Sequence, residues 1–198
     1  PNGLRLGATV SAESDADRMT DQDGLTNLDP AADLPNRDSD DGLTFTAYWI
    51  DGTPAVITYT VTAPASATAG DRYVNIWVDW NRDGDWADGE VACVHGARDE
   101  HVLINQVVNV PAQVAPGATA AFLVPVNPCQ PVLMDRAWVR ITLSDKPVAT
   151  ADDDGRGPGP CFAEGETEDY LYDPTLEFGD APDSTNNDGQ PMTTSSPA

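Results

Sequence analysis

Residues 43–62, LTFTAYWIDGTPAVITYTVT, decide the fold of this chain. Residues 43–50 and 54–62 are rich in Thr, Val, Ile and aromatic side chains, which β-strands favour. Asp51-Gly52 stands between the two runs, and this dipeptide is typical of the tight turn in a β-hairpin. The stretch therefore predicts an antiparallel hairpin.

The same alternating pattern continues through the rest of the chain. Residues 72–79 and 136–144 place apolar side chains at every second position, as half-buried strands do. Further strand-like runs occupy 91–94, 101–110, 119–126 and about 168–172. Turn residues separate these runs, and apolar residues do not recur at helical spacing. We predict an all-β fold, an antiparallel β-sandwich (jelly-roll-like) with long acidic loops.

Composition divides the chain into three parts. Residues 1–42 are rich in Asp and have little apolar periodicity, so we expect an acidic, loop-rich lead-in packed on the sandwich. Residues 43–173 would form the sandwich core. Residues 174–198 carry too few apolar side chains to build a core, which predicts a linker or an inter-subunit arm that orders against a neighbour.

The charge of the chain excludes several classes of function. Its 198 residues include 33 acidic and 10 basic side chains, giving a formal net charge of -23. Such a surface repels phosphate backbones, so we expect no nucleic-acid binding. No apolar run approaches the roughly 18 to 20 residues of a membrane-spanning helix. The excess of Asp, which prefers turns, fits either a salt-adapted surface or binding of hard divalent cations.

One acidic loop matches a metal-binding pattern in full. Residues 79–90, DWNRDGDWADGE, fit the calcium-loop pattern D-x-[DN]-x-[DN]-G-x5-E, with Gly84 at the position that needs a sharp bend. Strand-like sequence flanks the loop, so the usual helical frame is not expected. The alternative is a structural turn, because Asp, Asn and Gly also favour turns. The predicted calcium ligands are Asp79, Asn81, Asp83, Asp85 and Glu90.

Two further acidic clusters are candidates for metal binding. In EGETED at 164–169, Glu166 and Glu168 would share one strand face with Asp169 opposite. These residues would complete or support a metal site, or form a solvated turn. The second cluster fits no single spacing template. It comprises Asp15, Asp17, Asp21 and Asp23, which Asp38, Asp40 and Asp41 could join.

Three segments together resemble the GEVED domain of bacterial secreted and surface proteins. They are WVDWNRDGDW at 77–86, WVRITLSD at 138–145 and GETEDY at 165–170, with Thr167 replacing the Val of the signature. FGDAPDS at 178–184 is similar to the linker between such units. The resemblance implies a β-sandwich with a structural or adhesive role and no established catalysis. It supplies no ligand residues.

The cysteines and histidines give weaker signals. Cys93, Cys129 and Cys161 form no C-x-x-C motif, so a secreted protein would have one disulfide and one thiol. We favour Cys129–Cys161, because both lie in Pro-rich loops flanking residues 136–144, with the other pairings open. His95 and His101 are interpreted as surface histidines. No catalytic motif is present, and we expect no enzyme.

These observations predict a calcium-stabilised extracellular structural or adhesive module at the cell surface. Its partners would be neighbouring copies of itself or adjacent repeat units, joined through the C-terminal arm into a filament or tandem array. The alternative is a carbohydrate-binding module of a larger secreted enzyme. In that case Trp80 and Trp86 would be exposed and would contact a glycan.

Overall fold

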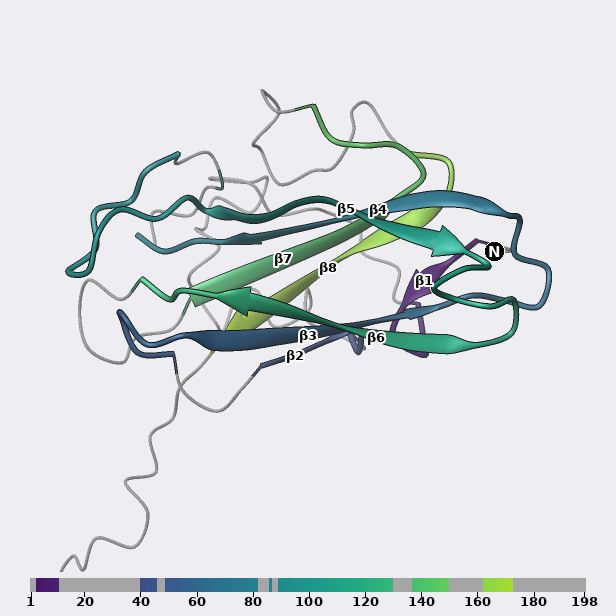
Figure 1. Cartoon of the computed structure of the whole chain (residues 1–198), viewed down its shortest axis with the longest axis horizontal. Coiled ribbons are helices and arrows are strands. Elements are labelled where there is room, and N and C mark those ends of the chain that lie inside the picture. Colours follow the sequence, from purple (N-terminus) through teal and green to yellow (C-terminus); the bar gives the residue numbers. More distant parts are fainter. Residues whose placement is uncertain are drawn as a thin grey trace, which may run out of the picture.

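The computed structural model describes residues 3–10, 40–45, 49–81, 86, 89–129, 137–149 and 162–172. In this part of the chain the regular elements are all β-strands, and they form two antiparallel sheets packed face to face (Figure 1). The predicted β-sandwich is therefore confirmed. No helix among these residues is long and apolar enough to cross a membrane.

The first sheet is built around a central strand. β3 (Ala55–Thr62) pairs along its full length with β6 (Thr119–Val126). The other side of β3 pairs with two short strands, β1 (Arg5–Leu6) and β2 (Leu43–Phe45). The β2–β3 pairing confirms the predicted hairpin.

The turn of this hairpin lies where the sequence placed it. The Thr53 N–H donates to the Ile50 carbonyl at 2.9 Å, which closes the turn around Asp51 and Gly52. Gly52 has a φ of 76°, a backbone conformation that glycine adopts without steric cost.

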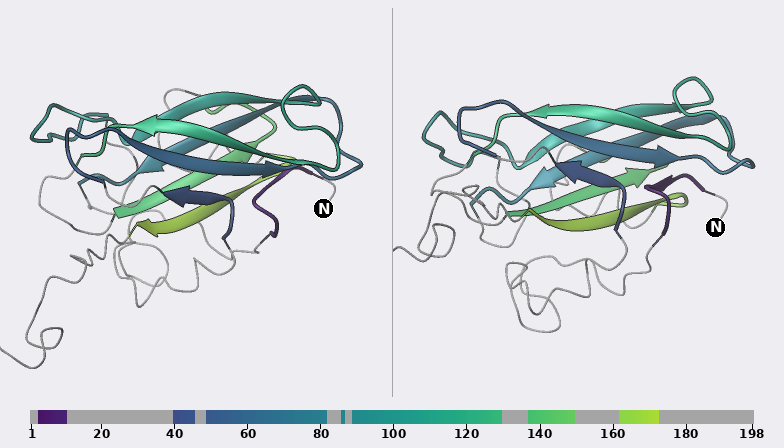
Figure 2. Two further views of the ribbon diagram at one scale, coloured as in Figure 1. Left: turned by 60° about the horizontal axis from the view of Figure 1, so that its bottom comes forward. Right: turned by 90° about the horizontal axis from the view of Figure 1, so that it is seen from below.

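The second sheet has the strand order β5-β4-β7-β8. Its strands are β4 (Gly70–Val78), β5 (His101–Val110), β7 (Ala137–Ser144) and β8 (Gly165–Tyr172). Strand β8 is one edge, and it contacts β1 of the first sheet. Figure 2 shows β1 and β2 lying beside β8. The opposite edges of the two sheets, β5 and β6, consequently lie together on the other side of the sandwich.

The core fills the space between the two sheets and follows the alternation of the strands. Side chains at every second position of β3, β4 and β7 are fully buried and pack together. These residues are Ile57, Tyr59, Val61, Val74, Ile76, Val78, Val139, Ile141 and Leu143. The apolar residues of the period-two pattern therefore face the core, while in β7 the residues between them are buried as well.

Three details differ from the expected strands. β1 was not predicted, because two residues are too few to show a period. Residues 91–94 form no strand and make only a single bridge, between Val91 and Arg98. β8 begins at Gly165, three residues before the expected start, because the acidic residues there pair with β7.

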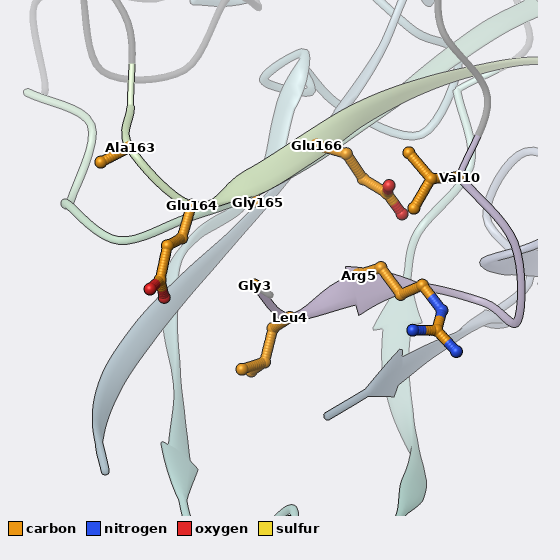
Figure 3. A pocket seen from close by; sticks show the side chains of 8 residues that line it. All are labelled: Gly3, Leu4, Arg5, Val10, Ala163, Glu164, Gly165 and Glu166. Carbon is orange, nitrogen blue, oxygen red and sulfur yellow. The ribbon is translucent and has the colours of Figure 1, made fainter. Parts of the chain in front are cut away.

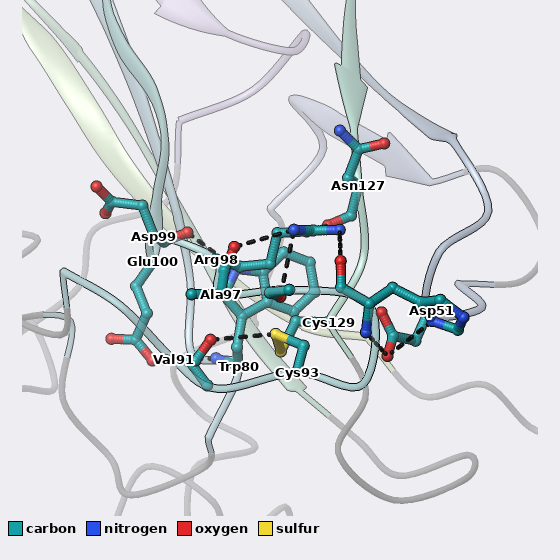
Figure 4. The surroundings of a disulfide bond; sticks show 12 residues. Asp51, Trp80, Val91, Cys93, Ala97, Arg98, Asp99, Glu100, Asn127 and Cys129 are labelled. Atoms are coloured by element: carbon teal, nitrogen blue, oxygen red, sulfur yellow. Dashed lines mark hydrogen bonds and ion pairs between the residues drawn. A yellow bond between two sulfur atoms is a disulfide. The ribbon is translucent and has the colours of Figure 1, made fainter.

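The disulfide joins Cys93 to Cys129, with their Cα atoms 5.4 Å apart (Figure 4). The preference for Cys129–Cys161 is therefore wrong; Cys161 lies outside the described residues. Cys93 belongs to the connection between β4 and β5, and Cys129 follows β6. The Arg98 side chain, which donates to the Asn127 carbonyl at 3.0 Å, holds the two segments together beside the bond. Folding brings these loops together, and their sequence spacing gives no sign of it.

Candidate functional site

The calcium-like loop begins at the end of β4. The Asp79 N–H donates to the Trp138 carbonyl at 3.0 Å, so Asp79 is held against β7 just beyond the end of β4. Asp79 is 1% exposed, whereas Asn81 is half-buried and Glu90 is exposed. The other two predicted ligands, Asp83 and Asp85, lie outside the described residues. The first loop position is therefore a buried carboxylate.

A second buried carboxylate, which sequence reasoning missed, lies beside Asp79. Glu100 is 0% exposed, and its Oε1 accepts a hydrogen bond from the Trp80 N–H at 3.1 Å. Its backbone carbonyl accepts a hydrogen bond from the Val78 N–H at 2.8 Å. Glu100 therefore bonds to the residues immediately before and after Asp79. A buried carboxylate is costly unless a cation or hydrogen bonds compensate it. Glu100 lies outside the twelve-residue pattern, and no sequence signal marks it.

The described residues do not by themselves form a complete metal site. Among them, no three His, Cys, Asp or Glu side chains are placed to hold a metal ion. Oxygen ligands for calcium would therefore have to include side chains or carbonyls from the rest of the loop.

The GETED signature forms the first half of β8, and its residues alternate between two faces. Glu166 and Glu168 pair with Leu143 and Ile141, whose side chains face the core. Asp169 pairs with Arg140 on the outer face. The predicted division of the acidic residues between two faces is thus what the register produces.

Gly165 opens the strand in a conformation that excludes other residues. Its φ is 124°, and a Cβ atom there would overlap the Leu143 carbonyl. Only glycine fits without displacing β7. This steric requirement accounts for the first letter of the signature.

The two inward glutamates attach the lead-in to β8. Glu166 Oε1 accepts from the Leu6 N–H at 2.5 Å, and Glu168 Oε2 accepts from the Gly42 N–H at 3.2 Å. The Tyr170 hydroxyl also donates to Glu168 Oε2, at 2.8 Å. Glu168 is 1% exposed, and its Oε1 has no hydrogen-bond partner within the described part of the chain. These carboxylates thus hold β1 and the start of β2 against the edge strand.

Burial and mutual repulsion shift the titration of this acidic cluster. The pKa of Glu166 is raised to about 8, mainly by burial and also by the charges of Glu168, Asp40 and Asp41, while the hydrogen bond from Leu6 lowers it. The pKa of Glu168 is raised to about 7, mainly by burial and also by the charges of Asp40 and Asp41, while hydrogen bonds from the Tyr170 hydroxyl and the Asp41 backbone lower it. The charges of Asp40 and Asp41 therefore belong to the same acidic cluster as the β8 glutamates. Asp15, Asp17, Asp21, Asp23 and Asp38 lie outside the described residues.

Asp169 has a different partner. It forms a buried ion pair with Arg140, whose Nε donates to Asp169 Oδ1 at 2.7 Å. The Arg140 guanidinium carbon also lies 5.1 Å from the centre of the Trp86 ring. Among the described residues, Asp169 is thus linked to the calcium-like loop through Arg140 and Trp86.

Glu166 lies far from the start of the calcium-like loop. Asp79 bonds to Trp138, which pairs with Leu171, whereas Glu166 is five residues further along β8. Five residues of strand span roughly 16 Å. The predicted metal residues among those described therefore fall into three groups: the start of the loop, the outward Asp169 and the inward glutamates.

The aromatic residues of the loop are buried. Trp80 packs in the core with its ring 5.5 Å from that of Trp49, and Trp86 packs on the outer face with Trp77 and Trp138. The exposed Trp80–Trp86 pair that glycan binding would require is not formed.

One of the two histidines is not at the surface. His101 is buried: it stacks on Trp77, with ring centres 4.3 Å apart, and its Nε2 lies 3.0 Å from Asn75 Oδ1. The interpretation of His101 as a surface residue was wrong, because it lies opposite Trp77 in the sheet and its ring is covered by that aromatic side chain on the outer face. His95 is exposed and lies 3.3 Å from Asp51.

A cavity of about 300 Å³ lies between β1 and the start of β8. Figure 3 shows the Glu166 carboxylate toward the Val10 end of this cavity and Glu164 at the other end. Glu164 is held by Arg72, whose Nε donates to it at 3.1 Å. The carboxylates at its two ends are therefore already engaged, Glu164 by a side chain and Glu166 by the backbone.

The architecture and the β8 signature together define the class of this protein as an acidic β-sandwich domain. The model of the GEVED domain matches residues 73–173, just over half of the chain, and the chain belongs to this family. Searches of curated proteins and of solved structures gave no match. The matched segment contains most of β4 and all of β5, β6, β7 and β8, together with the calcium-like loop.

Proposed function

We propose that this protein is a calcium-stabilised structural or adhesive module that acts outside the cell. The observation that carries the proposal is the burial of Asp79, the first residue of a complete calcium-loop pattern, beside the buried Glu100. Two carboxylates removed from water in one region favour a bound cation. Carboxylate and carbonyl oxygens are the ligands that calcium prefers.

The proposed ligand set combines the loop with one residue outside it. Asp79, Asn81 and Asp83 supply the first oxygens, and Asp85 is at the position that usually contributes a backbone carbonyl. Glu100 takes the place of the closing carboxylate, because it is buried whereas Glu90 is exposed. The bound ion would offset the repulsion among these groups and fix the loop on the end of the sandwich.

Calcium would act on this domain by binding only the folded loop. The stabilisation is RT ln(1 + [L]/Kd), which is about 1.4 kcal/mol when calcium is present at ten times its Kd. The Cys93–Cys129 disulfide supports an oxidising compartment, as expected for a secreted or surface protein. In the proposed role, neighbouring copies or adjacent repeats join through residues 174–198.

Thermal unfolding tests the calcium proposal. The midpoint should rise with added calcium, fall with a chelator, and lose its calcium dependence in Asp83→Ala. Asp71→Ala removes an exposed carboxylate away from the loop and should keep the full response. Equal melting of the parent chain with calcium and with chelator would refute the proposal, and an equal response to magnesium would reduce it to charge screening.

A further inference from the structure

The strands on one side of this acidic molecule contain no charged side chain. Residues 52–70 and 102–129 contain no Asp, Glu, Lys or Arg, although the whole chain has a net charge of -23. These ranges hold β3, β6 and all but the first residue of β5. β5 and β6 are the sheet edges opposite β1 and β8, so both edges on this side of the sandwich belong to the ranges without charged residues. We call it the uncharged side.

The uncharged side also exposes large apolar side chains. Leu123 on β6 is 71% exposed, and Ile104 and Val107 on β5 are exposed as well. Exposed apolar residues on an edge strand mark a surface that can pair with another strand.

The hydrogen-bond pattern shows which backbone groups of β6 are available. The Ala63 N–H donates to the Ala118 carbonyl, which fixes the alternation of the β3–β6 ladder. By this alternation the residues at even positions of β6 bond to β3. The N–H and C=O groups of Thr119, Ala121 and Leu123 point away from it. Within the described residues β6 pairs only with β3, so this edge can accept another strand.

Pro125 confirms the assignment of the free edge. It lies opposite Val56 and, having no N–H, occupies a position whose N–H would point away from β3. Proline also ends the row of donors on this edge. The part that can pair is therefore limited to 119–123, a segment centred on Ala121.

We propose that two copies of this chain associate through their β6 edges, antiparallel and centred on Ala121. The segment is self-complementary in this register: Ala121 lies opposite Ala121 of the second copy, and Thr119 opposite Leu123 of the second copy. Each of these pairs exchanges both N–H···O=C bonds. The arrangement has two-fold symmetry and extends the first sheet across both molecules.

The distribution of charge selects this side for self-association. Two chains of the same negative charge repel, and the repulsion is weakest where the surfaces that meet are uncharged. The opposite edge, at β8, carries the acidic cluster of Glu166, Glu168, Asp40 and Asp41. Salt reduces repulsion beyond a Debye length of about 8 Å at physiological ionic strength. Added sodium chloride should therefore increase the dimer fraction, whereas an interface held by ion pairs would weaken.

Sedimentation equilibrium over a range of concentrations tests the association. The parent chain should show a monomer–dimer equilibrium, and Ala121→Pro should be monomeric throughout, because it removes the central donors. Pro125 shows that β6 accepts proline in this orientation. Ala121→Thr keeps the N–H and should dimerise. Parent chain that stays monomeric at every concentration, or Ala121→Pro that dimerises like the parent, overturns the proposal.

Cysteine cross-linking tests the register, with Cys161→Ser as the background. In Ala121→Cys the two Cα atoms would lie about 5.5 Å apart, within reach of a disulfide. In Thr119→Cys the two cysteines would be four residues apart along the strands, roughly 13 Å, and should not cross-link. Cross-linking of Thr119→Cys alone refutes the register.

Deletion of residues 174–198 separates this surface from the proposed arm. The β6 dimer should survive the deletion, because it uses none of those residues. Loss of the dimer in the deleted chain would overturn the β6 assignment and leave the arm as the contact. The calcium response of the loop is independent of both results.

Discussion

The guanidinium of Arg140 and the carboxylate of Asp169 form an ion pair across β7 and β8 that solvent does not reach. Burying both charges is costly, and their attraction compensates only while both are present. This pair links the family signature on β8 to Trp86 of the calcium-like loop. It is the one place where the two acidic features of the sequence are coupled through described side chains.

Arg140→Met should lower the free energy of unfolding by about 3–5 kcal/mol, because it leaves the Asp169 carboxylate buried without its cation. The double variant Arg140→Met/Asp169→Leu should recover most of this loss. Denaturation in urea measures both. Lys146→Ala, which removes an exposed cation, is the control and should stay near the parent. A double variant as unstable as the single one would contradict the explanation.

Glu168→Gln should stabilise the protein at alkaline pH. The folded pKa of Glu168 lies above the ordinary value of 4.5, so folding favours its protonated form. This contribution is complete below about pH 4.5 and is lost as the pH rises through about 7. Since glutamine mimics the protonated acid, the gain should be on the order of 2 kcal/mol near pH 9 and small near pH 4. Unfolding curves over this pH range check it, and a gain independent of pH would argue against the buried charge.

Removal of Cys93 should destabilise the domain. The disulfide closes a loop with a sequence separation of 36 residues, for which chain entropy gives about 4 kcal/mol. Cys93→Ala and Cys129→Ala should therefore unfold at similarly reduced denaturant concentrations. Cys161→Ala should match the parent. Peptide mapping without reductant provides a direct check, and a Cys129–Cys161 peptide would show that the pairing is different.

Calcium binding should depend more on Glu100 than on Glu90. Glu100 is buried beside the start of the loop, whereas Glu90 is exposed. Glu100→Gln should weaken calcium affinity by at least tenfold, which corresponds to about 1.4 kcal/mol. Glu90→Gln should change it by less. Isothermal titration calorimetry measures both affinities. A larger loss of calcium affinity in Glu90→Gln than in Glu100→Gln would show that Glu90 is the closing ligand.

The strands could be predicted from the sequence because a sandwich buries every second side chain. Val74, Ile76 and Val78 are buried on one face of β4, and this is the period that the sequence displays. The first half of β8 has the same period, but its inward residues are Glu166 and Glu168. Carboxylates on a core-facing side resemble a solvated turn in sequence, so the start of the strand was missed.

The parts of the candidate site that sequence did not reveal depend on contacts between distant segments. Glu100 is buried because β5 begins opposite the end of β4, and a single glutamate has no pattern that announces this. The partner of Cys93 depends likewise on how two loops meet. Asp40 and Asp41 lay in an acidic run of no clear spacing, and only the position of β8 associates them with Glu166.

The bond between Cys93 and Cys129 has a mechanical consequence for a domain in a surface assembly. A pull on the two ends of the chain can unravel β-strands, but it cannot extend the segment between the two cysteines. With a separation of 36 residues and at most about 3.4 Å for each, roughly 120 Å of contour length is withheld from stretching. Reduction of the bond would release that length, so the redox state of the surroundings sets how far a loaded molecule can reach.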